Sequence, residues 1–464
     1  MPRRLAIFGG SFNPPGSHHV AIATALAGRF DEVIVVPCGP RPDKQETNET
    51  TPVFRAAMAD LAFGGIGGCQ VDLFDLEQST FTRNVDLQRR YASRGEVFHV
   101  VGGDLVAGGA SGDSPIQREW YRGRELWQDA HFLVVTRPGC QLSPDDLPPR
   151  HELLELAESG SSSAVRERLR DQRSAGDLLP PKILAYLQRY GLYRETIPNP
   201  ASRGRLDEVR ALFHVDRRSA QAVGLAGRFN RFLHEQDPNC ILVFGGDGSM
   251  LHAIREHWRR RLPFFGINTG HIGFLMNDDE EVLNGSFPPG DVMIRQLPML
   301  YVETRDADGH GQTDYAFNDA WLERSSSQSA WLRVTVDGVE RIPRLVGDGL
   351  LVSTAAGSTA YARSMGAPPL PANSPGWLLV GSNVMQPAGW KSALLSPEAC
   401  VEAVNLAPDK RPLTAYLDGI VGGPAVSMTA RLSRVAAVEL AFYPHHDMAE
   451  KIATIQFQHT GGGG

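Results

Sequence analysis

A single carboxylate stands at the centre of the glycine-rich segment Gly245-Gly246-Asp247-Gly248-Ser249, directly after an apolar strand pattern. Glycines let backbone N–H groups approach a phosphate, but a loop built only for phosphate has no use for an acid. Asp247 therefore indicates a second task, either abstraction of a hydroxyl proton or binding of magnesium. A turn aspartate that stabilises its own bend is the structural alternative. The chain contains neither a GxxxxGK[ST] loop nor the protein-kinase motifs, which excludes the usual ATPase sites.

A second glycine-rich segment, Gly9-Gly10-Ser11-Phe12-Asn13-Pro14-Pro15-Gly16-Ser17-His18-His19, joins an apolar run to a helical pattern. At such a junction, backbone N–H groups and the positive helix N-terminus can hold a phosphate chain, and a histidine can donate to a phosphate oxygen. Taken alone, the segment could equally be a structural turn, and the two histidines a surface pair.

Two stretches of alternating strand and helix patterns must position these segments. In the first, strands are predicted at 5–8, 33–36, 97–101 and 132–135, with helices at 19–30, 53–62, 83–94 and 182–190. The second has strands at 211–214, 241–244 and 264–267, with helices at 219–234 and from 249. Alternation of this kind predicts α/β domains in which helices cross over between parallel strands.

The chain changes character at two further places. Residues 196–205 are polar and carry two prolines, which predicts a linker. From about Ile294 the helical period ends, and runs such as 331–336 and 350–353 predict an antiparallel β-sandwich domain. We therefore expect an α/β domain over 1–195, a linker over 196–205, a second α/β domain over 206–293 and a β-rich domain over 294–464.

Composition limits the classes of partner. A net charge of -7 over 464 residues gives no general attraction to nucleic acid or anionic membranes. The five cysteines lie far apart, so they predict neither a zinc site nor a disulfide framework, and we expect no metal site of the protein's own. No apolar run approaches the roughly 18 residues of a membrane span. We expect a soluble, cytoplasmic enzyme whose partners are small molecules.

The N-terminal segment resembles the GGTFDPxHxGH signature of nicotinate/nicotinamide mononucleotide adenylyltransferases, within the HxGH nucleotidylyltransferase superfamily. Further motifs resemble the family's in the same order: Pro37 to Lys44, Arg55-Ala56-Ala57-Met58, Thr82 to Leu87, Gly103-Asp104, Trp120, Arg137-Pro138-Gly139 and Ser161 to Arg166. The resemblance covers nearly all of residues 1–195. It implies a Rossmann-like domain that transfers the adenylyl group of ATP to a pyridine mononucleotide and releases pyrophosphate, with Mg²⁺ carried mainly by ATP.

The same resemblance implies roles for individual residues. His19, Lys44 and Arg166 would hold the triphosphate, Asp104 would anchor ribose hydroxyls, and Trp120 with the Thr82 segment would frame the pyridine ring. Further nucleotide contacts would come from Gly9, Gly10, Ser11, Phe12, His18, Gly103, Arg137, Ser162 and Ser163.

One departure concerns the HxGH element itself. Gly16 stands where the family has its first histidine, and His18 stands where the family has glycine. Either His18 substitutes from a shifted position or the site is weakened.

The Asp247 segment resembles the GGDGT motif of NAD kinases, and the next matches again follow the family's order. They are Asn268 to Leu275, Asn318-Asp319, Gly347 to Tyr361 and Asp418-Gly419. The resemblance implies transfer of the ATP γ-phosphoryl group to the 2′-hydroxyl of the adenosine ribose of NAD, with Mg²⁺ bridging the ATP phosphates. Asp247 would orient and deprotonate that hydroxyl, and Asn318 and Asp319 would hold ribose hydroxyls. Phosphate and dinucleotide contacts would come from Gly246, Gly248, Asn268, Phe274, Ser358, Thr359 and Tyr361.

Together the two resemblances imply a bifunctional enzyme that makes NADP from a pyridine mononucleotide and two ATP molecules. Fusion favours nicotinamide mononucleotide, because the deamido dinucleotide would need amidation before it could serve the kinase, although the N-terminal motifs look like a branch that often prefers nicotinate. Two alternatives stay open: an NAD kinase with a non-catalytic or nicotinate-specific first domain, and a pyridine-nucleotide sensor without turnover. By analogy with NAD kinases, we expect a homo-oligomer.

Overall fold

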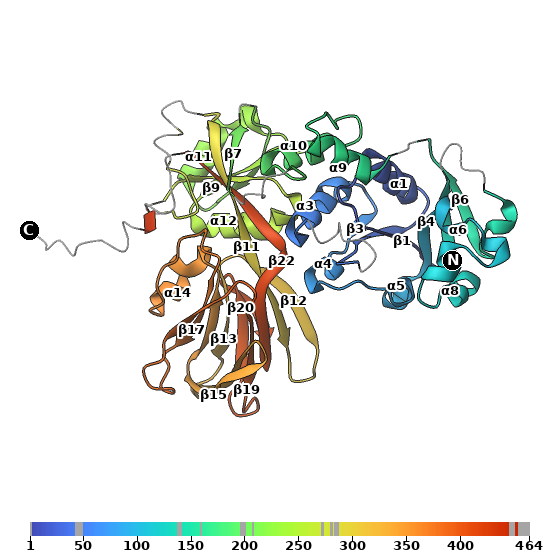
Figure 1. Ribbon diagram of the computed structural model, residues 1–464. Helices are drawn as coiled ribbons and strands as arrows, with labels where there is room; N and C mark the ends of the chain where they lie inside the picture. Colours follow the sequence, from blue (N-terminus) through green and yellow to red (C-terminus); the bar gives the residue numbers. More distant parts are fainter. Residues whose placement is uncertain are drawn as a thin grey trace, which may run out of the picture. The chain divides into compact units, whose positions relative to one another are not determined.

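The computed structural model describes residues 2–41, 50–136, 142–157, 160–194, 201–206, 208–270, 273–278, 282, 287–444 and 451–452. The chain forms two compact units, Met1–Asn199 and Pro200–Gly464 (Figure 1). Over the described ranges, no helix combines the length and apolarity needed to cross a membrane.

In its described part, unit 1 contains a six-stranded parallel sheet in the order β3-β2-β1-β4-β5-β6. The strands are β1 (Arg4–Gly10), β2 (Glu32–Pro37), β3 (Cys69–Val71), β4 (Glu96–Gly102), β5 (His131–Thr136) and β6 (His151–Glu155). The helices are α1 (Ser17–Ala27), α3 (Pro52–Phe63), α4 (Phe74–Gln78), α5 (Asn84–Tyr91), α6 (Gly103–Val106), α7 (Pro115–Glu119), α8 (Gly123–Asp129), α9 (Ser162–Arg170) and α10 (Pro181–Tyr190). This strand order is that of a doubly wound Rossmann-like fold, and it confirms the predicted parallel sheet.

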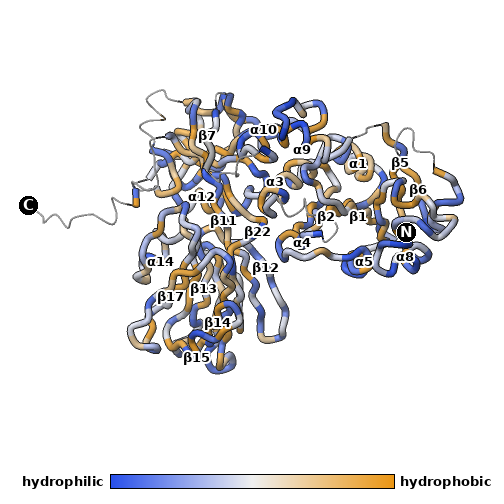
Figure 2. Tube along the Cα trace, in the orientation of Figure 1, coloured by the Kyte–Doolittle hydropathy of each residue, from blue (hydrophilic) through white to orange (hydrophobic). Residues whose placement is uncertain are grey.

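Alternation along β1 explains why helices cover both faces of this sheet. Leu5 and Ile7 belong to a buried cluster with Leu87 of α5. The ring of Phe8, on the opposite face, packs edge-on against Phe63 of α3. Figure 2 shows hydrophobic colours along the central strands and hydrophilic colours along α5 and α8. The order of the strands reverses between β1 and β4, where such sheets bind ligands at the carboxyl ends of their strands.

The first part of unit 2 contributes one antiparallel strand and three parallel strands to a larger sheet. Its first strands are β7 (Ala201–Leu206), β8 (Ala211–Val215), β9 (Cys240–Gly245) and β10 (Phe264–Asn268), and its helices are α11 (Ala220–Arg228) and α12 (Asp247–His257). Strands β8, β9 and β10 are parallel. Leu242 and Phe244 of β9 face the core beneath α11, whereas Ile241 and Val243 face the core beneath α12. This arrangement agrees with the second predicted alternation.

Two long antiparallel strands connect this segment to the rest of unit 2. They are β11 (Gly290–Arg305) and β22 (Ser427–Phe442). Their pairing shifts register between Pro298 and Leu300, where an irregularity of this kind bends the pair. The predicted domain boundary at 293/294 therefore falls inside β11, and one sheet continues across it. The predicted linker is also corrected, because residues 201–206 form β7 and pair with β11.

The remaining strands are antiparallel, as predicted, and build a sandwich from two sheets. They are β12 (Gly311–Ala316), β13 (Asp319–Arg324), β14 (Ala330–Val336), β15 (Val339–Gly347), β16 (Gly349–Ser353), β17 (Trp377–Ser382), β18 (Ser392–Leu395), β19 (Cys400–Asn405), β20 (Leu413–Leu417) and β21 (Ile420–Pro424). A short 3-10 helix, η6 (Ala356–Thr359), and α14 (Tyr361–Ser364) follow β16. One sheet supplies Leu332 and Val401 to the buried core, and the other supplies Leu322, Val352 and Leu379.

Candidate functional sites

The glycine-rich turn of unit 1 connects β1 to α1 and is fixed by two buried arginines. Arg55, 1% exposed, donates to the carbonyl oxygens of Ser11 (2.7 Å) and Cys38 (2.6 Å). Arg166, 5% exposed, donates to the carbonyl oxygen of Asn13 at 2.7 Å. Both guanidinium groups thus donate hydrogen bonds to backbone carbonyl oxygens. Arg166, predicted to bind phosphate, therefore stabilises the turn.

Phe12 and the serines of α9 complete this support. Phe12 is buried with a φ of 45°, and an added Cβ at Gly10 would lie 2.9 Å from its ring. Ser162 Oγ donates to the carbonyl oxygen of Pro14 at 2.8 Å, and Ser163 Oγ accepts from Arg166 Nη2 at 3.1 Å. These predicted nucleotide contacts are therefore placed where they shape the turn.

The two histidines lie against each other at the start of α1. Their ring centroids are 3.9 Å apart. His19 Nδ1 accepts the Gly16 backbone N–H at 3.0 Å, so a neutral His19 carries its proton on Nε2. His18 is buried, and an added Cβ at Gly16 would lie 2.8 Å from its ring. A side chain at position 16 would overlap the His18 ring in its observed place. Glycine at position 16 and histidine at position 18, the two departures from HxGH, therefore depend on one another.

A cavity of about 800 Å³ opens at the carboxyl ends of β1, β2 and β4. Its lining includes five of the predicted residues, namely Gly9, Gly10, Thr82, Asp104 and Trp120. This volume is within the range of small-molecule sites, and the place is the switch point of the sheet. Gly103 opens α6 directly before Asp104. The predicted residues Lys44 and Arg137 lie outside the described residues.

The cavity is also lined by residues that were not singled out from the sequence as site residues. Asp75 accepts from Thr82 through the hydroxyl (2.6 Å) and the backbone N–H (3.1 Å), and burial raises the pKa of its carboxyl while these bonds oppose the rise. Burial lowers the pKa of His99 to about 4, which keeps its imidazole neutral. Arg83 lies 4.3 Å from the centroid of the Tyr121 ring. A carboxyl, a neutral imidazole and a cation on an aromatic ring thus face one cavity.

In unit 2, Asp247 is the first residue of α12 and lies at the carboxyl end of β9. Its two carboxylate oxygens accept the backbone N–H groups of Phe274 and Leu275, both at 2.9 Å. Burial raises the pKa of Asp247, whereas these two bonds and the charge of Lys451 lower it. Among the described residues, no atom lies within 4 Å of a Cβ added at Gly246 or at Gly248. Open space therefore adjoins a partly buried carboxylate.

The segment around Phe274 is held from two sides. Lys451, which sequence reasoning missed, donates to the carbonyl oxygens of Gly273 (3.0 Å) and Met276 (2.7 Å). Burial lowers the pKa of this lysine, and the charges of Asp278 and Asp247 raise it. Predicted Asn268 closes the preceding turn, because its Oδ1 accepts the Gly270 N–H at 3.1 Å. His271, within the same predicted motif, lies outside the described residues.

Asp319 is the first residue of β13, Asn318 directly precedes it, and both side chains are buried. Asn318 Oδ1 is buried and has no hydrogen-bond partner among the described residues. Burial, and then the nearby charge of Asp418, raise the pKa of Asp319 to about 8. Asp418 itself accepts the backbone N–H groups of Phe317 and Asn318, each at 2.7 Å. Two buried polar side chains therefore lie next to an aspartate that is engaged with the backbone.

The turn after β16 packs beside this pair. An added Cβ at Gly357 would lie 2.2 Å from the Asn318 carbonyl oxygen, which explains the glycine. Ser358 is fully buried, and its Oγ donates to Ala355 O (2.6 Å) and accepts from Leu370 N (2.8 Å). Its contact with a ligand stays a prediction. Thr359 is half-buried, and Tyr361 is 42% exposed.

A shared core brings these elements of unit 2 together. Met250 of α12, Leu275, Phe317 and Ala356 of η6 belong to one cluster of buried residues. The helix of Asp247, the segment that binds its carboxylate and the start of the Asn318 pair are therefore packed as one assembly.

Comparison with known proteins finds similarity in both units. Residues 7–168 match the cytidylyltransferase-like family, and residues 220–284 match the ATP-NAD kinase N-terminal domain. The chain is 30% identical over 254 residues to the NAD kinase of Rickettsia canadensis, which covers 54% of this chain and 98% of that relative. It is 34% identical over 223 residues to the NAD kinase of Rickettsia akari, covering 48% of this chain and 87% of the relative. A crystal structure of an NAD kinase from Archaeoglobus fulgidus in complex with ATP aligns with 20% identity and a TM-score of 0.40, covering 53% of this chain and 98% of that chain.

Proposed function

Because the chain belongs to the NAD kinase family and carries a cytidylyltransferase-like domain before the kinase part, we propose that it is a bifunctional enzyme making NADP from nicotinamide mononucleotide. One observation carries the proposal: in both units a glycine-rich turn ends a parallel strand and opens a helix. Fusion of the two activities favours the nicotinamide form, since NAD is the acceptor of the second step.

In the first step, the phosphate of the mononucleotide attacks the α-phosphorus of MgATP, and pyrophosphate leaves. The reaction needs alignment and positive charge near the phosphates. The cavity supports this step, because Gly9 and Gly10, at the carboxyl end of β1, line it and can admit phosphates. Trp120 also lines the cavity, and its ring can stack on the pyridine. Asp104 is the acceptor for ribose hydroxyls.

The imidazoles of the first site come from positions 18 and 19 in this proposal. His19 donates through Nε2, because its Nδ1 is occupied by the Gly16 N–H. His18 replaces the family's first histidine, which its contact with His19 and its position over Gly16 support. If the replacement fails chemically, the first domain only binds nucleotide and the protein is an NAD kinase alone.

In the second step, the 2′-hydroxyl of the NAD adenosine ribose attacks the γ-phosphorus of MgATP, and ADP leaves. Asp247 accepts the hydroxyl proton, and its burial supports this role because a raised pKa makes the carboxylate a better base. Asn318 Oδ1 accepts a substrate hydroxyl or amide hydrogen, which would satisfy a buried atom that otherwise lacks a described partner. Asp319, mostly protonated at neutral pH, can donate a hydrogen bond.

Two variants and a control test the two-site proposal. Asp247→Asn should convert nicotinamide mononucleotide to NAD but form no NADP, because only the kinase base is lost. His19→Ala should form no NAD from the mononucleotide yet phosphorylate added NAD. Asp308→Asn, at an exposed aspartate, should keep both activities. Loss of both activities in Asp247→Asn would contradict independent sites, and unchanged NADP formation would remove Asp247 from the chemistry.

A further inference from the structure

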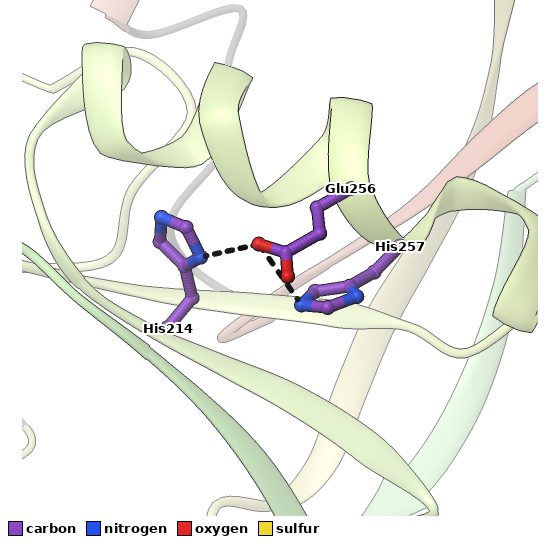
Figure 3. A group of neighbouring side chains, drawn as sticks. All are labelled: His214, Glu256 and His257. Atoms are coloured by element: carbon purple, nitrogen blue, oxygen red, sulfur yellow. Dashed lines mark ion pairs between the residues drawn. The ribbon is translucent and has the colours of Figure 1, made fainter.

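Two histidines and a glutamate of unit 2 converge away from the residues discussed above. His214 lies on β8, and Glu256 and His257 are the last two residues of α12. His214 Nδ1 and His257 Nε2 each lie 3.6 Å from the same atom, Glu256 Oε2. Figure 3 shows both rings directed at the carboxylate. Three potential ligand atoms, one from each residue, lie within 4.8 Å of one another.

The spacing of these atoms fits a small divalent cation. Tetrahedral Zn²⁺ binds nitrogen and oxygen ligands at about 2.0–2.1 Å, which separates neighbouring ligand atoms by about 3.4 Å. The two separations of 3.6 Å from Glu256 Oε2 need only a slight contraction, and the two imidazole nitrogens, which lie within 4.8 Å of each other, must also approach. Two imidazole nitrogens and one carboxylate oxygen form a common zinc donor set that leaves a fourth position for water.

The exposure of the three side chains agrees with such a ligand. The His214 and His257 side chains are 21% and 12% exposed, whereas that of Glu256 is 64% exposed. The two imidazoles are therefore held by the fold, and the glutamate closes the cluster from the solvent side. A divalent cation would interact with all three groups.

We propose that His214, Glu256 and His257 bind a divalent transition metal, with Zn²⁺ as the best match, and that this metal fastens the end of α12 to β8. Helix α12 begins with Asp247, the proposed base of the kinase step. The metal would therefore stabilise the helix on which that base lies. The prediction of no metal site rested on the spacing of cysteines, and this cluster contains none.

Zinc titration of the full chain tests the proposal. Protein freed of metal with chelator is titrated with ZnCl₂ in a calorimeter without nucleotide, and Co²⁺ serves as a spectroscopic probe of tetrahedral coordination. Compared with the unaltered chain, His214→Asn, Glu256→Gln and His257→Gln should each lose one bound Zn²⁺ per chain or weaken its binding by at least about 10- to 100-fold, because even the loss of a group that only orients a ligand costs that much. His310→Gln, at an exposed histidine of the same unit, is the matched control and should bind like the unaltered chain.

Thermal unfolding gives a second readout that does not depend on activity. Zn²⁺ should raise the unfolding midpoint of the unaltered chain and of His310→Gln, but not that of the three cluster variants. Zinc binding of equal stoichiometry and affinity in all variants would overturn the proposal, as would failure of the unaltered chain to bind Zn²⁺ at micromolar concentration. Loss of binding in His310→Gln alone would move the site to the exposed turn formed by Asp306, Asp308 and His310.

Discussion

Asp319→Asn should stabilise unit 2, and the gain should grow with pH. Asp319 is 3% exposed, and burial together with the charge of Asp418 raises its pKa to about 8. The residues that the structure describes donate no hydrogen bond to this carboxyl. An asparagine has the same size and cannot ionise, so it removes the cost of keeping an acid protonated in the folded state.

The magnitude follows from the two pKa values. An unfolded aspartate has a pKa of about 3.9, so below that pH both states are protonated and the carboxyl brings no penalty. Between about pH 4 and the folded pKa of about 8, unfolding releases a proton, and stability falls by up to about 1.4 kcal/mol per pH unit. Above pH 8 the penalty is constant. Because the folded state relaxes around a buried charge, we expect Asp319→Asn to gain about 2–4 kcal/mol at pH 8 and about 1 kcal/mol at pH 5.

Urea unfolding at pH 5, 6.5 and 8 measures the gain in the free energy of unfolding of Asp319→Asn. Hydrogen exchange in peptides of β13 reports unfolding of unit 2 separately from that of unit 1. The Kd for NAD of the same variant should rise, because the donor that Asp319 offers to a substrate hydroxyl is altered. An equal gain at all three pH values, or a loss of stability at pH 8, would refute the claim that Asp319 is held protonated.

Further predictions concern both active sites. His18→Ala should lower pyrophosphate release from ATP and nicotinamide mononucleotide at least about tenfold while phosphorylation of added NAD is unchanged, and an unchanged release rate would exclude His18 from catalysis. Trp120→Ala should raise the KM for the mononucleotide about tenfold or more, because stacking on a base is worth about 1–3 kcal/mol, and an unaltered KM would place the ring elsewhere. Lys451→Met should move the acidic limb of the kinase pH–rate profile to higher pH, since the charge of Lys451 lowers the pKa of Asp247, and an unmoved limb would show that Asp247 is not the group titrated.

The sequence correctly predicted the features that depend on neighbouring residues in the chain. The turns that end β1 and β9 were identified because glycines between an apolar run and a helical period permit few other structures. Non-local pairing was not visible in the same way. Residues 201–206 look like a linker because they are polar, and they become a strand only because β11 lies beside them.

Side-chain placement within the sites also depended on distant partners. The sequence showed that Gly16 and His18 depart from HxGH, but not that the His18 ring occupies the space over Gly16. Lys451 could not be linked to the Phe274 segment, because nothing in its own neighbourhood indicates the fold-back that joins them. His214 likewise lies far along the chain from Glu256.

The most direct test of the bifunctional proposal is a chromatographic time course with the full chain, MgATP and either nicotinamide or nicotinate mononucleotide, following each dinucleotide separately. The proposal predicts that NAD appears first from the nicotinamide form and that NADP follows at its expense. No dinucleotide from either mononucleotide, with NADP still formed from added NAD, would contradict the proposal and leave an NAD kinase with a non-catalytic first domain.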